Sequence, residues 1–349
     1  MRIAITADPY LPVPPKLYGG IERVVDLLAR GLVSRGHSVT LFAHPESRTG
    51  GTLVPYGIPP HVGPRARISE LWQVGGELWR RRAEFDLVHS FGRLAALLLV
   101  LPLRGLPKIQ SYQRDLVPWG GVKMAVRLAG PSIRFTACSA SVCRELPSQG
   151  VYGGQWHAIH NGVEMARYDF VPRVAPDAPL AFLGRLEPIK GAHHAIAIAR
   201  AAGRRLIIAG NRVNAGATRD YFDRQIAPHL DGTHVTYVGP VDDEQKNALL
   251  GSVVALLMPV EWDEPFGIVM AEALACGTPV IGFARGSVPE VIRHGVNGYL
   301  CRTVDEAAAA VGRLERIDRV LVRSDCETRF SDRAVVDAYE RLYREAMNR

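Results

Sequence analysis

Short apolar runs alternate with amphipathic stretches along the first half of the chain. Residues 21–35 place apolar side chains at helical spacing and are followed by Gly36, a residue type that often ends helices. The apolar runs lie at residues 2–7, 38–43, 87–90, 108–111 and 134–139. They show little polar alternation, which is typical of strands buried in a parallel sheet with both faces covered. The alternation predicts an α/β fold.

The same alternation restarts in the second half. Expected strands lie at 181–183, 205–209, 235–238, 254–258 and 279–283, with helices near 191–202, 218–229, 243–251, 266–275 and 334–347. Residues 170–179 are rich in Pro and have no periodicity, so we expect the linker between the halves there. A length of 349 residues also exceeds the usual size of a single hydrophobic core. We predict two doubly wound, Rossmann-like domains, at 1–170 and 176–333, which face a central cleft and bind ligands at the carboxyl ends of their strands.

The composition, 47% hydrophobic and 22% charged, is that of a soluble globular enzyme and is too apolar for disorder. Five cysteines are an odd number without CxxC spacing, so we expect reduced thiols rather than disulfides or a zinc site. The N-terminal MRIAITAD lacks the apolar region of a signal peptide. The apolar run at 94–103 is too short to span a bilayer and is expected to be a buried helix. We therefore expect a cytoplasmic protein.

The net charge of +7 is concentrated in the first half. Residues 1–170 carry 20 Lys and Arg against 12 Asp and Glu, whereas the remainder carries 22 against 23. A basic half suits nucleic acid, anionic lipid or a phosphorylated substrate, but without an RNA-binding aromatic signature or a zinc finger we do not expect nucleic acid. Basic residues beside apolar ones at 79–82 and 123–127 have two interpretations: a solvated basic face, or a peripheral contact at the inner face of the membrane.

The stretch EPFGIVMAEALACGTPVIGF at 264–283 carries two carboxylates eight residues apart. Pro265 suits the first position of a helix, and the next amides would then point free at the helix start, where an anion binds. These are the amides of Phe266, Gly267 and Ile268. Glu264 has two interpretations, a helix cap and a ligand-binding carboxylate. Glu272 lies among apolar residues, where a carboxylate needs a partner.

Two cations follow the first expected strand of the second half, in FLGRLEPIKG at 182–191. Arg185 and Lys190 can converge on a diphosphate, the arginine as a planar fork and the lysine as a point charge. A pair of surface cations is the alternative. No D-x-D motif occurs, so the usual acidic clamp for a nucleotide-bound metal is missing. We expect no metal and no cofactor, with arginine and lysine supplying the positive charge.

Gly19 and Gly20 stand directly before the helix expected at 21–35. They resemble a phosphate-cradling loop, but the GxGxxG pattern and a Walker lysine are absent. A tight turn is the alternative interpretation.

Together these motifs resemble the retaining, nucleotide-sugar-dependent glycosyltransferases of family 4, which have the GT-B fold of two Rossmann-like domains. The resemblance covers YGGIERVV at 18–25, HNGVE at 160–164, FLGRLEPIKG, YVGPV at 237–241, EPFGIVMAEALACGTPVIG and GSVPEVI. The order and spacing of the Arg-x4-Lys and Glu-x7-Glu pairs carry it. The family fold implies that the C-terminal helix at 334–349 packs back on the first domain.

The resemblance implies a role for each matching residue. Arg185 and Lys190 would neutralise the diphosphate as the sugar–phosphate bond breaks. Glu264 would hold donor-sugar hydroxyls, and Glu272 would accept hydrogen bonds from the ribose. The remaining donor-binding positions are Gly19, Gly20, Gly184, Gly239, Val241, Phe266, Gly267 and Ile268.

The first half departs from the family pattern at one point. Many members carry His-x-His at the end of the fourth strand, whereas here His89 matches the first histidine and Phe91 occupies the second position. His89 is a candidate catalytic residue, with a structural strand-end histidine as the alternative, and Phe91 would line the acceptor pocket. Tyr112 and Arg114 are further acceptor-binding candidates. A milder change puts Ser287 where a second glycine is common.

The implied reaction is transfer of a hexose from a nucleoside diphosphate sugar, UDP-glucose-like, to a glycan, lipid or small-molecule acceptor, with retention at the anomeric carbon. The departing phosphate itself would help to deprotonate the acceptor, so no protein nucleophile is required. One alternative is a non-catalytic nucleotide-sugar-binding module, which Phe91 motivates. Another is an epimerase or phosphorylase on the same fold.

Overall fold

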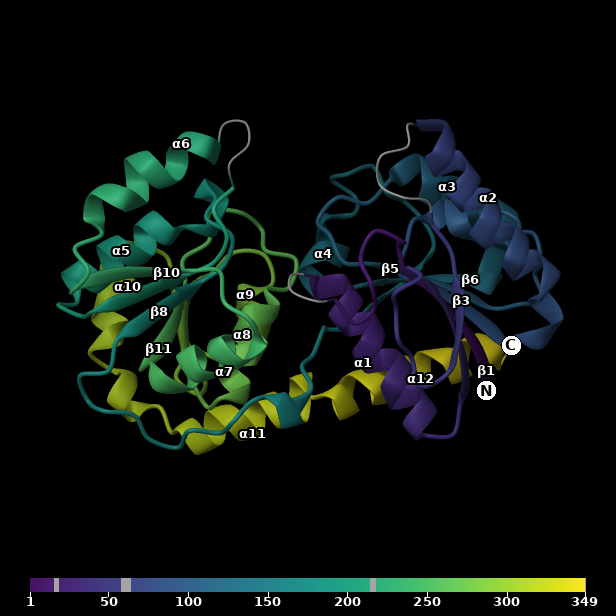
Figure 1. The fold of residues 1–349 in the computed structure, drawn as a ribbon. Coiled ribbons are helices and arrows are strands. Elements are labelled where there is room, and N and C mark those ends of the chain that lie inside the picture. Colours follow the sequence, from purple (N-terminus) through teal and green to yellow (C-terminus); the bar gives the residue numbers. More distant parts are fainter. Residues whose placement is uncertain (16–18, 58–63, 214–217, 349) are drawn as a thin grey trace. The chain divides into compact units, whose positions relative to one another are not determined.

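The computed structural model describes residues 1–15, 19–57, 64–213 and 218–348 (Figure 1). The chain forms two compact units. The first contains Met1–Asn161 and Asp332–Arg349, and the second contains Gly162–Ser331. Each unit is built on its own parallel sheet, of seven strands in the first and six in the second. Two Rossmann-like α/β units of this kind confirm the predicted fold class.

The sheet of the first unit has the order β3-β2-β1-β4-β5-β6-β7. Its strands are β1 (Arg2–Thr6), β2 (Ser38–Ala43), β3 (Thr52–Pro55), β4 (Leu87–Ser90), β5 (Lys108–Tyr112), β6 (Ile133–Ala137) and β7 (Gln155–Ala158). Strand β1 lies at the centre, where Ile3 pairs with Val39 on one side and with Leu87 on the other. Sequence order reverses on the two sides of β1, as in a doubly wound sheet.

Helices cover both faces of this sheet. They are α1 (Gly20–Ser34), α2 (Pro64–Arg80), α3 (Trp119–Ala129), α4 (Ala140–Glu145) and α12 (Asp332–Met347), with 3-10 turns at Arg82–Glu84, Leu94–Leu97 and Gly130–Ser132. Ile3 and Ile5 face one core, which α1 and α12 close. Ala4 faces the opposite core, which α2 and α3 close. Strand alternation therefore feeds two separate hydrophobic cores.

The C-terminal helix α12 belongs to the first unit and packs against α1 (Figure 1). Tyr339 and Tyr343 are fully buried among the apolar residues of α1 and β1. A Cβ atom at Gly31 of α1 would clash with the side chain of Val336, so the two helices approach closely there. This packing accounts for the strong amphipathic pattern of the C-terminal segment.

The sheet of the second unit has the order β10-β9-β8-β11-β12-β13. Its strands are β8 (Leu180–Leu183), β9 (Leu206–Ala209), β10 (Val235–Gly239), β11 (Ala255–Met258), β12 (Val280–Phe283) and β13 (Gly298–Cys301). The longer helices are α5 (Ala192–Ala201), α7 (Asp243–Ser252), α8 (Ile268–Ala275), α10 (Val304–Val311) and α11 (Arg319–Phe330), and α9 (Val288–Val291) is a single turn. The central strands β11 and β12 are wholly buried, as their apolar sequences predict.

Two predicted helices take a different form. The apolar run at 94–103 contains only the 3-10 turn Leu94–Leu97, followed by further turns up to Pro102. The segment at 218–229 divides into the short helix α6 (Arg219–Tyr221), a turn of π-helix at Phe222–Ile226 and a turn of 3-10 helix at Ala227–His229. Pro102 and Pro228 lack a backbone N–H, so neither segment completes a regular ladder of helical hydrogen bonds.

The two units divide at Asn161 and Gly162, ahead of the Pro-rich segment at 170–179. Val163 bridges to Ser331, and the N–H of Val171 donates to the carbonyl of Cys276. Residues 162–179 are therefore attached to the second unit, although their sequence has the composition of a linker. No described helix is both long and apolar enough to cross a membrane.

Candidate functional site

The predicted donor residues of the second unit lie at the carboxyl ends of neighbouring strands. Strands β8 and β11 are adjacent and parallel, so the loops that follow them emerge at the same edge of the sheet. The loop after β8 carries Arg185 and Lys190, and the loop after β11 carries Glu264. A backbone hydrogen bond from the N–H of Glu261 to the carbonyl of Ile189, at 2.9 Å, ties the two loops together.

Lys190 and Glu264 form a nearly buried ion pair. The Lys190 Nζ donates to the Glu264 Oε2 at 2.7 Å, and the side chains are only 16% and 7% exposed. The indole N–H of Trp262 donates to the same oxygen at 3.0 Å, and Lys190 Nζ lies 4.6 Å from the centre of the Trp262 ring. Three contacts therefore hold the ammonium and the carboxylate at the sheet edge, with little water to screen them.

Arg185 has its own carboxylate partner and keeps a large exposed surface. Its Nη1 lies 2.9 Å from Oε1 of Glu187, and its side chain is 41% exposed. Glu187 itself is mostly buried. A guanidinium has five N–H donors, so one ion pair leaves most of them available to an anion.

Helix α8 begins at Ile268, with Gly267 as its N-cap, rather than at Pro265. Gly267 has φ 69°, a left-handed conformation that favours glycine, and a Cβ there would lie 3.2 Å from Cγ of Glu264. The helix start therefore presents the amides of Ile268 and Val269, whereas Phe266 turns its ring into the core against Phe330. The helix therefore begins two residues later than the sequence pattern predicts.

The GSVPE turn supports the backbone of Glu264. The N–H of Ser287 donates to the Glu264 carbonyl at 2.8 Å, and the N–H of Gly286 donates to Oδ1 of Asp263 at 3.1 Å. Gly286 has φ 55°, and a Cβ atom there would clash with the backbone of Glu264. Ser287 thus contributes its amide, and the glycine that the turn requires is Gly286.

Glu272 is buried in the second turn of α8 and has two donors. The hydroxyl of Tyr168 donates to its Oε1 at 2.8 Å, and Nζ of Lys246 donates to the same oxygen at 2.6 Å. Lys246 also pairs with Asp243 at 3.4 Å. The Glu272 carboxylate, which was expected to need a partner, therefore forms an ion pair with Lys246 and accepts a hydrogen bond from Tyr168, and both partners lie outside α8.

The remaining predicted donor positions of the second unit follow strands β8 and β10. The carbonyl of Gly184, after β8, lies so close to Gly210 that Gly210 has no room for a Cβ. Gly239 sits at an irregularity in the pairing of β10 with β9 and has φ 81°. Val241 is half-buried and precedes the Asp242 cap of α7. These three positions share the sheet edge with Arg185.

In the first unit, Gly19 caps α1 and accepts a hydrogen bond from the N–H of Arg23 at 3.1 Å. A Cβ at Gly19 would lie 2.7 Å from Pro15, whereas a Cβ at Gly20 would meet nothing within 4 Å. Gly19 therefore has a steric reason to be glycine. Tyr18, which belongs to the same motif, lies outside the described residues.

His89 lies in the core of the first unit, which favours the alternative interpretation of a structural strand-end histidine. It is 0% exposed; its Nδ1 is 2.6 Å from the Tyr343 hydroxyl and its Nε2 is 2.7 Å from Oγ of Ser111. Burial lowers the pKa of His89 to about 3, so the imidazole is neutral at neutral pH. Strand alternation turns residue 89 towards the core that α12 closes, and both ring nitrogens are used there.

Of the three acceptor-binding candidates, Phe91 and Tyr112 are buried and Arg114 is exposed. Phe91 is buried, and the centre of its ring lies 4.2 Å from the centre of the His89 ring. Tyr112 is almost buried, stacks on Trp156, and has a hydroxyl without a hydrogen-bond partner among the described residues. Burial raises its pKa well above the usual range. Arg114 is exposed and lies near Glu22. Burial raises the pKa of the Glu22 carboxyl, and the positive charge of Arg114 partly offsets this rise.

Comparison with known proteins identifies the family. The sequence model described as Glycosyltransferase Family 4 matches residues 18–167, and the one described as Glycosyl transferases group 1 matches residues 172–334. The chain is a family 4 glycosyltransferase. The two matches together span both units, as the motifs in each half predict.

Relatives and solved structures agree with this assignment. The glycogen synthase of Mycobacterium tuberculosis strain H37Rv is 28% identical, over 89% of this glycosyltransferase and 84% of the relative. The phosphatidyl-myo-inositol mannosyltransferase of Propionibacterium freudenreichii is 27% identical, over 94% of this chain and 87% of the relative. AviGT4, a glycosyltransferase involved in avilamycin A biosynthesis, superposes with a TM-score of 0.72 at 29% identity over 99% and 98%. Anabaena HepE, solved with UDP and glucose, shares the fold, with a TM-score of 0.74 and 19% identity over 98% of this chain and 99% of HepE.

Several side chains of this glycosyltransferase contact the predicted site residues but were not themselves predicted as site residues. Trp262, Glu187, Lys246 and Tyr168 each contact a predicted residue directly. Trp262 and Glu187 stand two residues from Glu264 and Arg185, so proximity along the chain was the available signal. Lys246 and Tyr168 are distant in sequence from Glu272, and only the folded chain brings them together.

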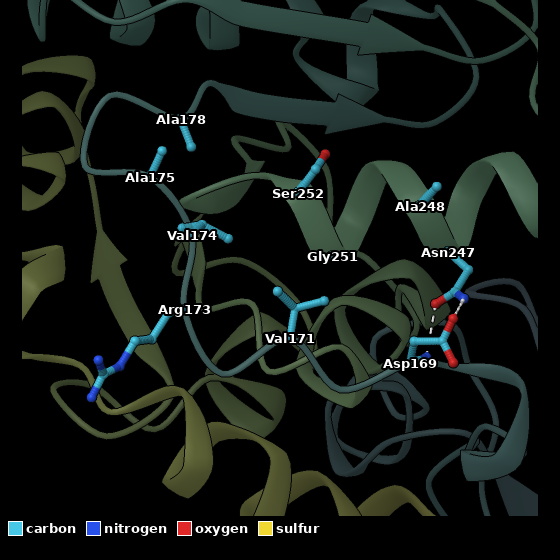
Figure 2. Close-up of a pocket in the computed structure, with 10 residues that line it drawn as sticks. All are labelled: Asp169, Val171, Arg173, Val174, Ala175, Ala178, Asn247, Ala248, Gly251 and Ser252. Atoms are coloured by element: carbon cyan, nitrogen blue, oxygen red, sulfur yellow. Dashed lines mark hydrogen bonds between the residues drawn. The ribbon is translucent and has the colours of Figure 1, made fainter.

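A separate pocket of the glycosyltransferase lies between the segment at 169–178 and α7 (Figure 2). Its lining includes the pair Asp169 and Asn247, in which the Asn247 amide donates to Oδ2 of Asp169 at 2.8 Å. Most of the other lining residues have small or apolar side chains, namely Val171, Val174, Ala175, Ala178, Ala248, Gly251 and Ser252. None of the predicted donor residues lines this pocket.

Proposed function

We propose that this glycosyltransferase moves a hexose from a nucleoside diphosphate sugar, UDP-glucose-like, to a hydroxyl of a glycan, lipid or small molecule, with retention at the anomeric carbon. The observation that carries the proposal is the nearly buried Lys190–Glu264 pair, which stands beside Arg185 and the start of α8 at one sheet edge. Two cations and a helix start form a site for a diphosphate, and the carboxylate among them suits sugar hydroxyls.

The proposed chemistry is electrostatic. As the bond between the anomeric carbon and the diphosphate breaks, negative charge grows on the departing phosphate, and Arg185 and Lys190 stabilise it. Glu264 accepts hydrogen bonds from sugar hydroxyls, and the departing phosphate takes the acceptor proton, so no protein nucleophile takes part. Glu272 holds the ribose hydroxyls. His89 has no part in this scheme because both of its nitrogens are used in the core.

The test combines nucleotide binding with turnover. Purified protein is titrated with UDP, GDP and ADP by calorimetry, and then incubated with UDP-glucose, GDP-mannose or ADP-glucose and a panel of acceptors. Acceptor-dependent release of nucleoside diphosphate, with an α-linked product from an α-linked donor, supports the proposal. Folded protein that binds none of the nucleotides contradicts it, and binding without release by any acceptor favours the non-catalytic alternative.

We also propose a peripheral contact between the first unit and an anionic membrane, which would place the enzyme at the inner face of a cytoplasmic membrane. Trp119 and Met124 of α3 are exposed, together with Leu116 just before it, and Lys123 and Arg127 are exposed on the same helix. Apolar and cationic side chains combined in this way suit an anionic lipid surface.

Co-sedimentation with vesicles tests the membrane contact. Binding to vesicles with phosphatidylglycerol, weakened by salt and by Trp119→Ser with Met124→Ser, supports it. Equal recovery in the supernatant with neutral and anionic vesicles contradicts it.

A further inference from the structure

Three side chains with metal-ligating chemistry meet at the start of α5. His193 and His194 belong to the first turn of the helix, and Glu261 comes from the loop after β11. One ligand atom from each lies within 4.8 Å of the other two. Nε2 of His194 is 2.8 Å from Oε1 of Glu261, and Nε2 of His193 is 3.8 Å from the same oxygen. Ligands at about 2.0–2.1 Å from a tetrahedral ion are about 3.4 Å apart, so these distances bracket the spacing that an ion requires.

We propose that His193, His194 and Glu261 form a binding site for a divalent transition-metal ion, with Zn²⁺ as the best match. Two imidazoles and one carboxylate are a ligand set that zinc accepts in tetrahedral geometry, with water in the fourth position. Magnesium and calcium prefer shells of oxygen ligands, so two nitrogen ligands disfavour them.

Tyr221 holds the ring of His193 in the orientation that this site requires. Its hydroxyl lies 2.8 Å from Nδ1 of His193 and accepts the backbone N–H of the same residue at 3.2 Å. With Nδ1–H donating to this oxygen, the lone pair of Nε2 faces Glu261. Metal-binding histidines are commonly oriented through their second nitrogen in this way. Burial raises the pKa of Tyr221 to about 12, so the phenol remains a neutral partner.

The site is accessible from solvent. His193 and His194 are half-buried and Glu261 is exposed, so an ion can enter from solvent.

An ion at this position would fasten the loop after β11 to the start of α5. Glu261 already donates its N–H to Ile189, directly before Lys190. Trp262, the next residue after Glu261, donates to Glu264. The ion would therefore stabilise the loops that position Lys190 and Glu264 without contacting the sugar donor, and its binding is independent of the donor's identity.

Metal binding by the whole chain tests the proposal. Protein stripped with EDTA is titrated with Zn²⁺ by calorimetry, with Co²⁺ as a spectroscopic probe. We expect one Zn²⁺ per chain, a visible Co²⁺ spectrum of a tetrahedral nitrogen and oxygen site, and a higher melting temperature with Zn²⁺. His194→Ala and Glu261→Gln should each weaken binding at least tenfold, and Tyr221→Phe should weaken it about 10-fold to 100-fold.

His234→Ala is the matched control, because this exposed histidine pairs with Asp231 elsewhere in the same unit and its loss should leave Zn²⁺ affinity unchanged. His194→Gln is the second variant if His194→Ala does not fold, since it keeps a hydrogen-bond donor towards Glu261. No binding at micromolar Zn²⁺, or equal affinity in the wild type and the His194 and Glu261 variants, would overturn the proposal. A Co²⁺–thiolate absorption band would also overturn it, because the ion would then occupy cysteine.

Discussion

The ammonium nitrogen of Lys190 lies 2.7 Å from Oε2 of Glu264, across two loops that follow neighbouring parallel strands. Both side chains are nearly buried, so removal of either one leaves the other as a poorly solvated charge. The lysine proposed to bind the diphosphate and the glutamate proposed to bind the sugar are therefore one unit, and the effects of changing them are coupled.

Variants of this pair should show that coupling in turnover. Lys190→Met removes the charge proposed to stabilise the leaving diphosphate and should lower kcat/KM by about 10²-fold to 10³-fold. Glu264→Gln keeps an acceptor for Trp262 but leaves Lys190 without its counter-charge, and we expect a loss of similar size. In the double variant, the increase in activation free energy should be about 1–3 kcal/mol smaller than the sum of the increases in the two single variants. Such non-additivity is expected for residues in direct contact. Release of nucleoside diphosphate measures all three values.

The control for this cycle is Arg205→Met, which removes an exposed cation of the same unit that pairs with Asp177. Its kcat/KM should match that of the wild type. Additive losses at Lys190 and Glu264 would contradict the coupled pair, and a wild-type rate for Lys190→Met would contradict the role proposed for this lysine.

Glu272 should act on nucleotide affinity rather than on the chemical step. Glu272→Gln removes the charge that we propose accepts ribose hydroxyls, so the Kd for the nucleoside diphosphate and the donor KM should rise about tenfold, with kcat nearly constant. Calorimetry and initial rates separate these quantities. Tyr168→Phe is the matched control, because it removes one donor to Glu272 and keeps Lys246; it should lower stability and leave the nucleotide Kd unchanged. Unchanged affinity in Glu272→Gln would contradict the ribose role.

The sequence pattern predicts the interior strands of both sheets and misses three strands at the sheet edges, β3, β7 and β13. The expected strands at 38–43 and 87–90 coincide with β2 and β4, which are buried over nearly their whole length. The edge strands β3 and β7 were not predicted, because each has only four residues and none of them is buried. An edge strand is defined by its hydrogen bonds to a neighbour, and these leave no periodicity in a short sequence.

The candidate site was predictable as a set of residues and only partly as a set of contacts. Motif spacing gives Arg185, Lys190 and Glu264, but their pairing depends on which strands are adjacent. The contacts of His89 could not be predicted for the same reason. Alternation gives the face of β4 on which a residue lies, whereas the helix that covers this face supplies Tyr343, 254 positions away along the chain. Local pattern carries no information about such a contact.

The buried His89 should make the first unit less stable in acid. Its pKa is about 3 in the folded chain and about 6.5 in the unfolded chain, so between these values only the unfolded state binds the proton. The contribution of the neutral His89 to the unfolding free energy is complete above pH 6.5. It falls by about 1.4 kcal/mol for each pH unit between pH 6.5 and pH 3. In His89→Gln, which cannot titrate but can still form hydrogen bonds, the loss of stability on acidification should be smaller by this amount.

Urea unfolding at pH 7, 6, 5 and 4 checks this difference. Tryptophan fluorescence reports chiefly on the first unit, which holds Trp72, Trp79, Trp119 and Trp156, whereas Trp262 alone lies in the second. Parallel stability curves for the wild type and His89→Gln would contradict the assignment of a neutral, buried histidine.

The fully buried Lys108 should be a large structural contributor without a role in the reaction. Its Nζ donates to the carbonyls of Leu101 and Leu103, at 3.2 and 2.6 Å, and to Oγ of Ser132 at 2.8 Å. These bonds satisfy carbonyl groups in the turns at 98–103, where helical hydrogen bonds are missing. Lys108→Met fills the same space but leaves the acceptors unpaired, and should lower the unfolding free energy by about 2–5 kcal/mol. Lys123→Met, on the exposed face of α3, should change it by less than about 0.5 kcal/mol. If both variants unfold at the same urea concentration as the wild type, the buried ammonium does not stabilise the turns.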